Sequence, residues 1–592
     1  MSCRGVPGWG VKRQTGCIWL LSACPCRGRN PTASPNYMSL PANRGWGQWL
    51  AVESLEWDAA GSTPQEQVAN PMMKSLPRGG DGAGLEPMTG FERGLRWVVA
   101  VALVASVVAG GVGTRHWPLV GDAPLMHYVV LLMDHGKVPY REIVDINMPG
   151  TYALEWVAIH GLGPGGVGWR IFDFGLMAVC LGAMLAITWP VDGLMGLFAG
   201  TLFALIHLRD GPANSGQRDL MMTTMLLLGC AFLFYAMRRE RSWAAAGFGL
   251  FMGAATLIKP SGLLFGVAFA ALMVQRLWEL KRPWARYLLY ATAGFAVPVG
   301  VVAGYLVAHG ALGAFVAANR GLVAYHASLG RRSLAALVVG SFPTLLLLVT
   351  VPAVPLFVVK RPWMTWWGRV FLAGAAVGAA SYVMQGKGFP YHRYPTEAFL
   401  LLLCAWLLVL GLRETGWMRW AAVAGLAAGG LWLGPSSAWI ACHYDWRNQE
   451  FNRMLEADLT RLGGAELNGR VQCVDMTSGC VDTLYKMDLV ESTGYLYDCY
   501  MFQPQQTAVS EAYREGFWKA IEANPPEVMV VTNQGCFSLH QSWDMPLNWP
   551  QFAELLQTKY RLVAQRTPPH RVGWWRHPAE PNSYRLYVRE QP

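Results

Sequence analysis

The stretch Leu119–Leu154, LVGDAPLMHYVVLLMDHGKVPYREIVDINMPGTYAL, is the part of the chain that decides its fold. It follows the first strongly apolar segment directly, yet it is too polar to cross a bilayer itself. Asp122 stands near its start, and an aromatic, half-apolar helical pattern comes next. A turn at Gly136–Tyr140 then leads into a loop that carries Glu142 and Asp145. We expect such a segment to lie along a membrane face, with its carboxylates where lipid meets water.

The composition is typical of a membrane protein. Of the 592 residues, 53% are apolar and only 15% are charged. The 27 tryptophans fit aromatic belts at two membrane interfaces. The net charge of +10 comes from short basic clusters between apolar runs, which indicates membrane topology rather than a nucleic-acid partner. We find neither a phosphate-binding loop nor metal-ligand spacing, so we expect no cofactor and no obligatory divalent metal.

Apolar runs long enough to cross a membrane recur along the chain, and we count about eleven. They cover residues 97–113, 167–188, 191–208, 219–237, 243–258, 261–277, 287–309, 334–359, 370–385, 396–412 and 420–440. With the amino terminus inside, most loops rich in Arg and Lys are cytoplasmic, as the positive-inside rule prefers. An odd number of runs then places the region that follows them outside the cytoplasm.

We divide the chain into three parts. Residues 1–94 are rich in Gly, Pro, Arg and Cys, and we predict that they are disordered or a mis-assigned extension before a later start. Residues 95–440 form the membrane domain. Residues 441–592 are polar, with short strand-like and helix-like runs that predict a small α/β domain outside the cytoplasm. We expect at least one disulfide there, with the pairing left open among Cys473, Cys480, Cys499 and Cys536.

Three features of the first loop occur in the same order in a known family. Asp122 follows the first apolar run, a "G-x-x-P-Y-x-acid" turn reads Gly136-Lys137-Val138-Pro139-Tyr140-Arg141-Glu142, and an Asn-x-Pro reads Asn147-Met148-Pro149. This order resembles the first external loop of the GT-C superfamily of membrane glycosyltransferases, such as the lipid A aminoarabinose transferases and protein O-mannosyltransferases. Those enzymes take a sugar from a polyprenyl-phosphate carrier. The chain departs from the pattern at Ala123, where many relatives carry a second acid.

A second motif lies in a short loop between two late apolar runs, where residues 385–395 read QGKGFPYHRYP. It is similar to a "Q-x-K-x-x-x-Y-H-x-x-P" loop of bacterial GT-C enzymes, and the resemblance implies a role near the lipid-linked donor. Lys387 and Arg393 would hold a phosphate, while Tyr391 and His392 would contact sugar or prenyl chain. The alternative is an aromatic-belt loop with snorkelling cations.

Three further charged groups fall on the predicted outer face. Arg218-Asp219 begins the fourth run, Lys259-Pro260 interrupts a later one, and Arg320 belongs to a loop that ends at Arg331-Arg332. Arg218 and Arg320 are candidates for binding the donor phosphate. The alternatives are a structural ion pair for Arg218-Asp219, a plain turn for Lys259-Pro260, and anionic lipid headgroups for the basic loop.

Together these features predict an all-α polytopic membrane protein of GT-C type, with an extracytoplasmic α/β domain, in the inner (plasma) membrane. The function we expect is transfer of a sugar from a polyprenyl-phosphate carrier to an extracytoplasmic acceptor, with membrane lipid as the other partner. A transporter or channel is the main alternative outside this class, and a polymer ligase or polymerase acting on lipid-linked glycans is the alternative within it.

The resemblance also implies roles for residues of the first loop. Asp122 would be the general base, with Asp145 as the second candidate, and a single displacement would invert the anomeric configuration. Tyr140, Glu142 and Asn147 would contact substrate. The alternative for Asp122 is an amino-terminal cap of the helix that begins near Pro124.

Overall fold

The computed structural model describes residues 89–444, 449–476, 478–534, 537, 542–569 and 582–590. Most of the predicted extension 1–94 lies outside these residues, and so does Cys536. The membrane domain starts with α1 (Gly90–Thr114), which opens with a reciprocal capping box between Thr89 and Glu92.

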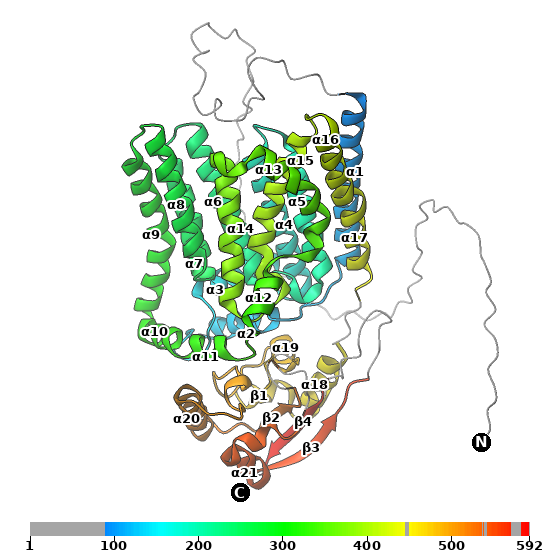
Figure 1. Cartoon of the computed structure of the whole chain (residues 1–592). Coiled ribbons are helices and arrows are strands. Elements are labelled where there is room, and N and C mark those ends of the chain that lie inside the picture. Colours follow the sequence, from blue (N-terminus) through cyan, green and yellow to red (C-terminus); the bar gives the residue numbers. More distant parts are fainter. Residues whose placement is uncertain are drawn as a thin grey trace, which may run out of the picture. The chain divides into compact units, whose positions relative to one another are not determined.

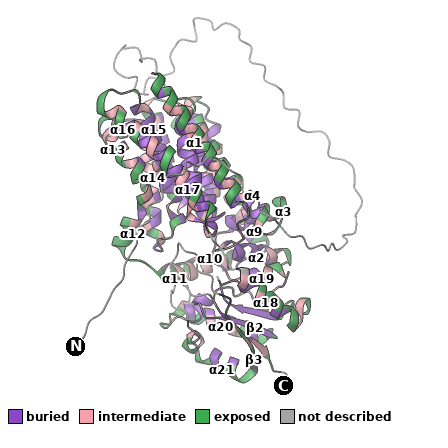
Figure 2. Cartoon of the chain, turned by 90° about the vertical axis from the view of Figure 1, so that its right-hand side faces the viewer, coloured by how far each residue is buried: buried purple, intermediate pink, exposed green. Residues whose placement is uncertain are grey.

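The described helices that follow α1 in this domain mostly pack side by side into a bundle, and the others lie at one end of it (Figure 1). They are α2 (Ala123–Asp134), α3 (Pro149–Leu162), α4 (Gly165–Thr188), α5 (Gly193–Asp210), α6 (Arg218–Arg238), α7 (Ala244–Ile258), α8 (Gly262–Glu279), α9 (Trp284–Ala308), α10 (Leu312–Arg320), α11 (Leu322–Ser328), α12 (Leu334–Ser341), α13 (Leu347–Lys360), α14 (Trp366–Gln385), α15 (Tyr394–Gly411), α16 (Gly416–Ala427) and α17 (Gly434–Cys442). Helix segments that face other helices are coloured as buried, and exposed residues lie mostly on the outward faces (Figure 2).

Seven helical segments of the described part are long and apolar enough to cross a membrane. They are Gly90–Thr114, Gly165–Thr188, Arg218–Arg238, Gly262–Glu279, Trp284–Ala308, Leu334–Lys360 and Pro390–Gly411. The protein is therefore a multi-pass membrane protein. Every predicted apolar run lies on a helix or on successive helices, but α7 has only 15 residues. The total of about eleven crossings stays a prediction.

The Arg- and Lys-rich segments 238–241 and 276–286, which connect α6 to α7 and α8 to α9, lie at one end of the bundle. At this end, which we call the basic end, ion pairs join the termini of neighbouring helices: Arg96–Asp192, Arg282–Glu240, Arg369–Glu279 and Arg419–Glu92. The opposite end, which we call the site end, is where α1 and α14 finish and where α6 and α15 begin. Helices α2, α3, α10 and α11 lie at the site end, next to the carboxy-terminal region (Figure 1).

The carboxy-terminal region contains a four-stranded mixed sheet. The strands β1 (Val471–Val474), β2 (Val528–Thr532), β3 (Tyr560–Arg566) and β4 (Tyr584–Arg589) lie in the order β1-β2-β4-β3. Strand β2 is parallel to β1 and antiparallel to β4. Every residue of β1 and β2 is buried, as expected for parallel strands covered on both faces. The helices of this region are α18 (Gln449–Leu462), α19 (Cys480–Lys486), α20 (Ala508–Ala523) and α21 (Pro550–Lys559).

A disulfide between Cys473 and Cys480 joins the end of β1 to the start of α19, with the two Cα atoms 5.9 Å apart. Cys499 is oxidised as well. The expectation of at least one disulfide in this region is confirmed.

Helix α2 lies between the bundle and the carboxy-terminal region. Nine of its 12 residues are buried, and Pro124 suits its first turn. The Tyr128 hydroxyl donates to the Leu489 carbonyl (3.1 Å) and accepts from the Glu491 amide (2.8 Å). We expected this helix to face the membrane surface, but residues from far along the sequence cover it.

Candidate functional site

Asp122 lies at the amino end of α2, but its side chain makes no hydrogen bond to the helix backbone. Its Oδ2 instead accepts from Arg218 Nη2 at 2.9 Å and from the Tyr391 hydroxyl at 3.5 Å. The helix-cap interpretation of this side chain is therefore wrong. The three residues come from loops far apart in the sequence, and all three are candidates that we named from sequence.

Two glycines allow the loops around this ion pair to approach closely. Gly121 has a φ of +75°, and a Cβ added there would lie 2.7 Å from the Ala213 carbonyl oxygen. Gly216 has a φ of +60°, and a Cβ there would overlap the Trp169 ring. Both positions therefore favour glycine on conformation and on space, and a side chain at either would disturb the packing of the loops that carry Asp122 and Arg218.

A second ion pair lies beside the first. Lys259 Nζ donates to Asp219 Oδ2 at 2.5 Å and to Gln385 Oε1 at 2.6 Å, so it ties the turn between α7 and α8 to both α6 and α14. Burial lowers the pKa of Lys259, and the Asp219 carboxylate opposes that shift. Lys259 therefore does more than form a turn between two short helices.

Lys387 is held only by neutral groups among the described residues. Its Nζ donates to the carbonyls of His326 and Leu329 and lies 3.9 Å from the centre of the Phe537 ring. Burial lowers the pKa of Lys387 to about 8. Burial, together with the positive charges of Lys387 and Arg218, lowers the pKa of His326 to about 3, so this imidazole is neutral at pH 7.

These residues form one group, which we call the polar cluster. Its members lie within electrostatic range of one another: Asp122, Arg218, Asp219, Lys259, His326, Lys387, Tyr391 and His392. Two carboxylates stand against three cations, which leaves a surplus positive charge. The Asp122 side chain is 33% exposed, whereas that of Asp219 is 0% exposed. The cluster thus offers one accessible carboxylate beside unneutralised positive charge.

Asp145, the second base candidate, is fully buried. Its Oδ1 accepts from the backbone and side-chain nitrogens of Asn147, both at 2.7 Å, and from the Tyr497 hydroxyl at 3.1 Å. These bonds fasten the first loop to the carboxy-terminal region. The geometry favours a structural role for Asp145 and Asn147.

Tyr140 and Glu142 stabilise the turn that contains them. Tyr140 adopts a φ of +70°, and its buried hydroxyl donates to the Asn147 carbonyl at 2.5 Å. Glu142 Oε2 accepts from the Val138 amide at 2.8 Å, which closes the turn. Neither side chain bonds to the polar cluster, and their contact with substrate stays a prediction.

The remaining two cations of the predicted phosphate site also lie outside the polar cluster. Arg393 pairs with Glu397 at 3.4 Å, one turn along α15. Arg320 is exposed at the end of α10, and none of the described residues pairs with it. Their part in donor binding stays a prediction.

A buried network that we did not identify from sequence supports the Arg218 loop. Asp173 of α4 pairs with Arg170, accepts from the Gly216 amide at 2.5 Å, and lies 3.0 Å from His207 Nε2. Arg170, Asp173 and His207 are at most 2% exposed. Their signal in the sequence is the presence of ionisable residues inside apolar runs, which usually marks paired or functional groups.

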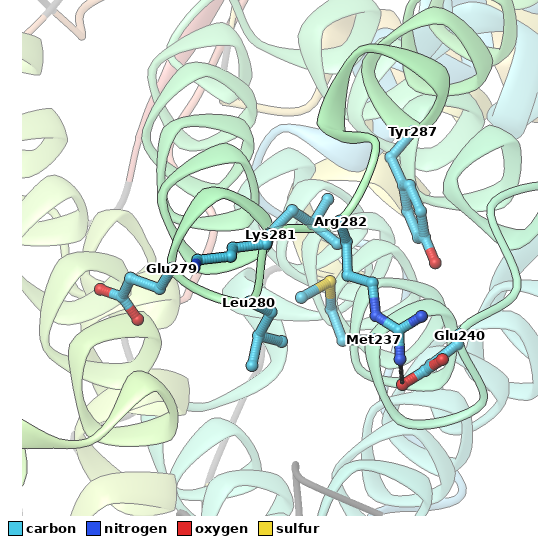
Figure 3. A pocket seen from close by; sticks show the side chains of 8 residues that line it. Met237, Glu240, Glu279, Leu280, Lys281, Arg282 and Tyr287 are labelled. Atoms are coloured by element: carbon cyan, nitrogen blue, oxygen red, sulfur yellow. Dashed lines mark hydrogen bonds and ion pairs between the residues drawn. The ribbon is translucent and has the colours of Figure 1, made fainter.

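A cavity of about 480 Å³ lies at the basic end, lined by Met237, Glu240, Leu277, Glu279, Leu280, Lys281, Arg282 and Tyr287. Figure 3 shows the ion pair between Arg282 and Glu240 at its edge. Met237 and Arg218 occupy opposite ends of α6, about 28 Å apart by helix rise. The cavity is therefore separate from the polar cluster. Within the described ranges, no group of three or more His, Cys, Asp or Glu side chains is placed to hold a metal ion.

No family model and no curated protein matches the sequence. The fold is similar to that of ArnT from Cupriavidus metallidurans bound to undecaprenyl phosphate, with a TM-score of 0.51 and 14% sequence identity over 83% of this chain and 98% of that one. ArnT in the apo state gives a TM-score of 0.51 and 15% identity over 83% and 97% of the two chains. The oligosaccharyltransferase of Archaeoglobus fulgidus, in its apo form, gives a TM-score of 0.45 and 11% identity over 81% and 75%.

ArnT is a GT-C membrane glycosyltransferase. The likeness covers nearly the whole ArnT chain, so it includes the bundle as a whole rather than a few helices. The resemblance inferred from the first loop is thus confirmed for the fold: this chain has the fold of a GT-C membrane glycosyltransferase.

Proposed function

We propose that the protein is a membrane glycosyltransferase that moves a sugar from a polyprenyl-phosphate carrier to an acceptor hydroxyl. The observation that carries this proposal is an accessible carboxylate next to positive charge. Asp122 pairs with Arg218, and Lys387 nearby has no carboxylate partner in the described part of the chain. The fold shared with ArnT, whose structure holds undecaprenyl phosphate, supports a lipid-phosphate donor.

The reaction needs a base and positive charge at the same membrane face. Asp122 takes the proton of the acceptor hydroxyl while the oxygen of that hydroxyl bonds to the anomeric carbon. The bond from that carbon to the phosphate oxygen breaks, and the phosphate leaves with its electron pair. Lys387 and Arg218 stabilise the charge on the departing group. A single displacement of this kind inverts the anomeric configuration.

The test is transfer from a purified donor. The protein, reconstituted in vesicles, is given undecaprenyl phosphate carrying a radiolabelled hexose or pentose, together with candidate lipid and glycan acceptors. We expect label in an acceptor and release of undecaprenyl phosphate in equal amounts. Label that crosses the membrane while still on its carrier would support a transporter instead. Elongation of a lipid-linked glycan would support a polymerase.

We also propose that the site end faces away from the cytoplasm, because the basic end carries the arginine-rich loops. Alkaline phosphatase fused after residue 590 should then be active, and green fluorescent protein fused there should be dark. The matched control is fusion within the loop 239–243, which should give the reverse pattern. The opposite result would be an active phosphatase in the loop and fluorescence of the carboxy-terminal fusion. It would contradict this orientation, and with it the proposal that the site of an inner-membrane enzyme lies outside the cytoplasm.

Donor affinity should depend on pH through Lys387. Because burial lowers the pKa of this lysine to about 8, it is charged below that pH and loses its proton above it. The KM for the lipid-phosphate donor should therefore rise as pH increases through about 8. Lys387→Arg should abolish that rise, since a guanidinium stays charged. Lys387→Ala should have a raised KM below pH 8, and its KM should approach that of the wild type above pH 8, where Lys387 is neutral too.

The control for Lys387 is the far-UV circular dichroism and melting temperature of each variant, which should match the wild type. If Lys387→Ala is expressed normally and has the same donor KM as the wild type below pH 8, the donor-binding role is wrong. The loop would then be an aromatic-belt loop with snorkelling cations.

A further inference from the structure

A pair of arginines at the site end has no protein partner. Arg331 and Arg332 lie between α11 and α12, both are exposed, and neither side chain forms a hydrogen bond or ion pair with any described residue. Adjacent like charges repel each other, and holding them together without a counter-ion is unfavourable. A ligand that neutralises both charges would remove this repulsion.

The backbone holds the two arginines against the Lys387 loop. The Arg332 amide donates to the Gly386 carbonyl at 2.9 Å. A Cβ at Gly386 would lie 3.2 Å from Arg331 Cγ, and a Cβ at Gly388 would lie 2.8 Å from Arg332 Cδ. The arginine stems therefore pack over these two glycines, one on each side of Lys387. Three cations converge on one short loop, so the site is built for an anion.

The position along the membrane normal identifies the kind of anion. The span Leu334–Lys360 begins two residues after Arg332, and the span Pro390–Gly411 begins three residues after Lys387. Leu334, Val338 and Val339 on α12 are 65%, 55% and 72% exposed, so this helix presents apolar side chains to lipid. Arginines immediately next to a lipid-facing helix lie at the level of the headgroup phosphates.

We propose that Arg331 and Arg332 form a binding site for the phosphate of an anionic phospholipid in the leaflet at the site end. Two guanidinium groups can each donate two parallel hydrogen bonds to phosphate oxygens, which favours a phosphodiester over a carboxylate. The acyl chains of the same lipid would lie against the exposed face of α12. This site borders the polar cluster at Lys387 but does not include Asp122 or Arg218, and it does not depend on the proposed sugar transfer.

The experiment measures lipid selectivity directly. The full-length protein is reconstituted in phosphatidylcholine vesicles that contain a trace of spin-labelled phosphatidylglycerol or spin-labelled phosphatidylcholine. Electron paramagnetic resonance then gives the association constant of one lipid relative to the other. We expect the wild type to prefer phosphatidylglycerol. Arg331→Gln/Arg332→Gln should lower that preference by about tenfold or more, because each cation near a membrane surface contributes roughly 1 kcal/mol.

The matched control is Arg115→Gln/Lys137→Gln, which removes two exposed cations from the same end of the bundle without touching the pair. It should keep most of the selectivity. Unchanged selectivity in Arg331→Gln/Arg332→Gln, or an equal loss in the control, would overturn the proposal. Unchanged selectivity with a raised donor KM in pure phosphatidylcholine would also overturn it, and would assign the pair to the phosphate of the carrier lipid.

Discussion

Replacing Asp122 by Asn should lower turnover by about two to four decades while leaving insertion and folding intact, if the carboxylate is the general base. Asn keeps the size of the side chain and an acceptor for the Arg218 hydrogen bond, but it cannot take a proton. The accessible position of Asp122, compared with the fully buried Asp219 and Asp145, is why we expect the effect at this residue. The measurement is single-turnover transfer from the lipid-linked donor.

Asp192 provides the matched control. Its side chain accepts from the Leu194 amide at 2.9 Å and pairs with Arg96 at the basic end, so it is a true helix cap. Asp192→Asn should preserve transfer, because Asn caps helices nearly as well. Near-normal turnover in Asp122→Asn would end the claim that Asp122 is the base, and Asp145 would then become the carboxylate to test.

The second large effect should come from Arg170. Arg170→Met leaves the fully buried Asp173 carboxylate without its guanidinium partner, and breaking a buried pair in this way costs about 3–5 kcal/mol. The free energy of unfolding, measured by denaturant titration in micelles, should fall by that amount. The Arg218 loop should loosen with it, because Asp173 also binds the Gly216 amide.

Arg282→Met is the control for Arg170. It breaks the ion pair between Arg282 and Glu240, whose side chains are 44% and 40% exposed. Exposed pairs contribute at most about 1 kcal/mol to the free energy of unfolding. Similar small losses in both variants would show that Asp173 is neutralised by its remaining partner, His207, and that Arg170 is not essential to the network.

Local patterns in the sequence predicted much of the fold. Each apolar run lies on a helix or on successive helices, because an apolar segment in a bilayer must satisfy its backbone hydrogen bonds internally. The change in composition after residue 440 likewise marked the start of the region with the sheet. The sequence did not predict that α2 is covered, because Leu489 and Glu491 reach Tyr128 from more than 350 residues away.

The candidate site was predicted only in part, for the same reason. Asp122, Arg218 and Tyr391 were named from their loops, but no local pattern shows which loops meet. Lys387 packs against the ring of Phe537, which follows β2 in the sequence and belongs to none of the motifs named above. Arg393 was named because it is a cation in the right loop, yet Glu397, four residues later on α15, pairs with it. Only spatial neighbours decide whether a charge is available.

The two glycines at the start and middle of the first loop differ in how much change each would tolerate. Both have positive φ, but a Cβ at Gly136 would meet nothing within 4 Å, whereas one at Gly121 would meet Ala213. At Gly136 only the backbone conformation disfavours a side chain, so Asn and Asp, which tolerate positive φ best, can replace glycine there without moving Asp122. At Gly121 a single added carbon would also press on the Ala213 backbone, so it would push the loops of Asp122 and Arg218 apart. A library of variants of this loop should therefore recover glycine alone at 121, and glycine together with Asn or Asp at 136.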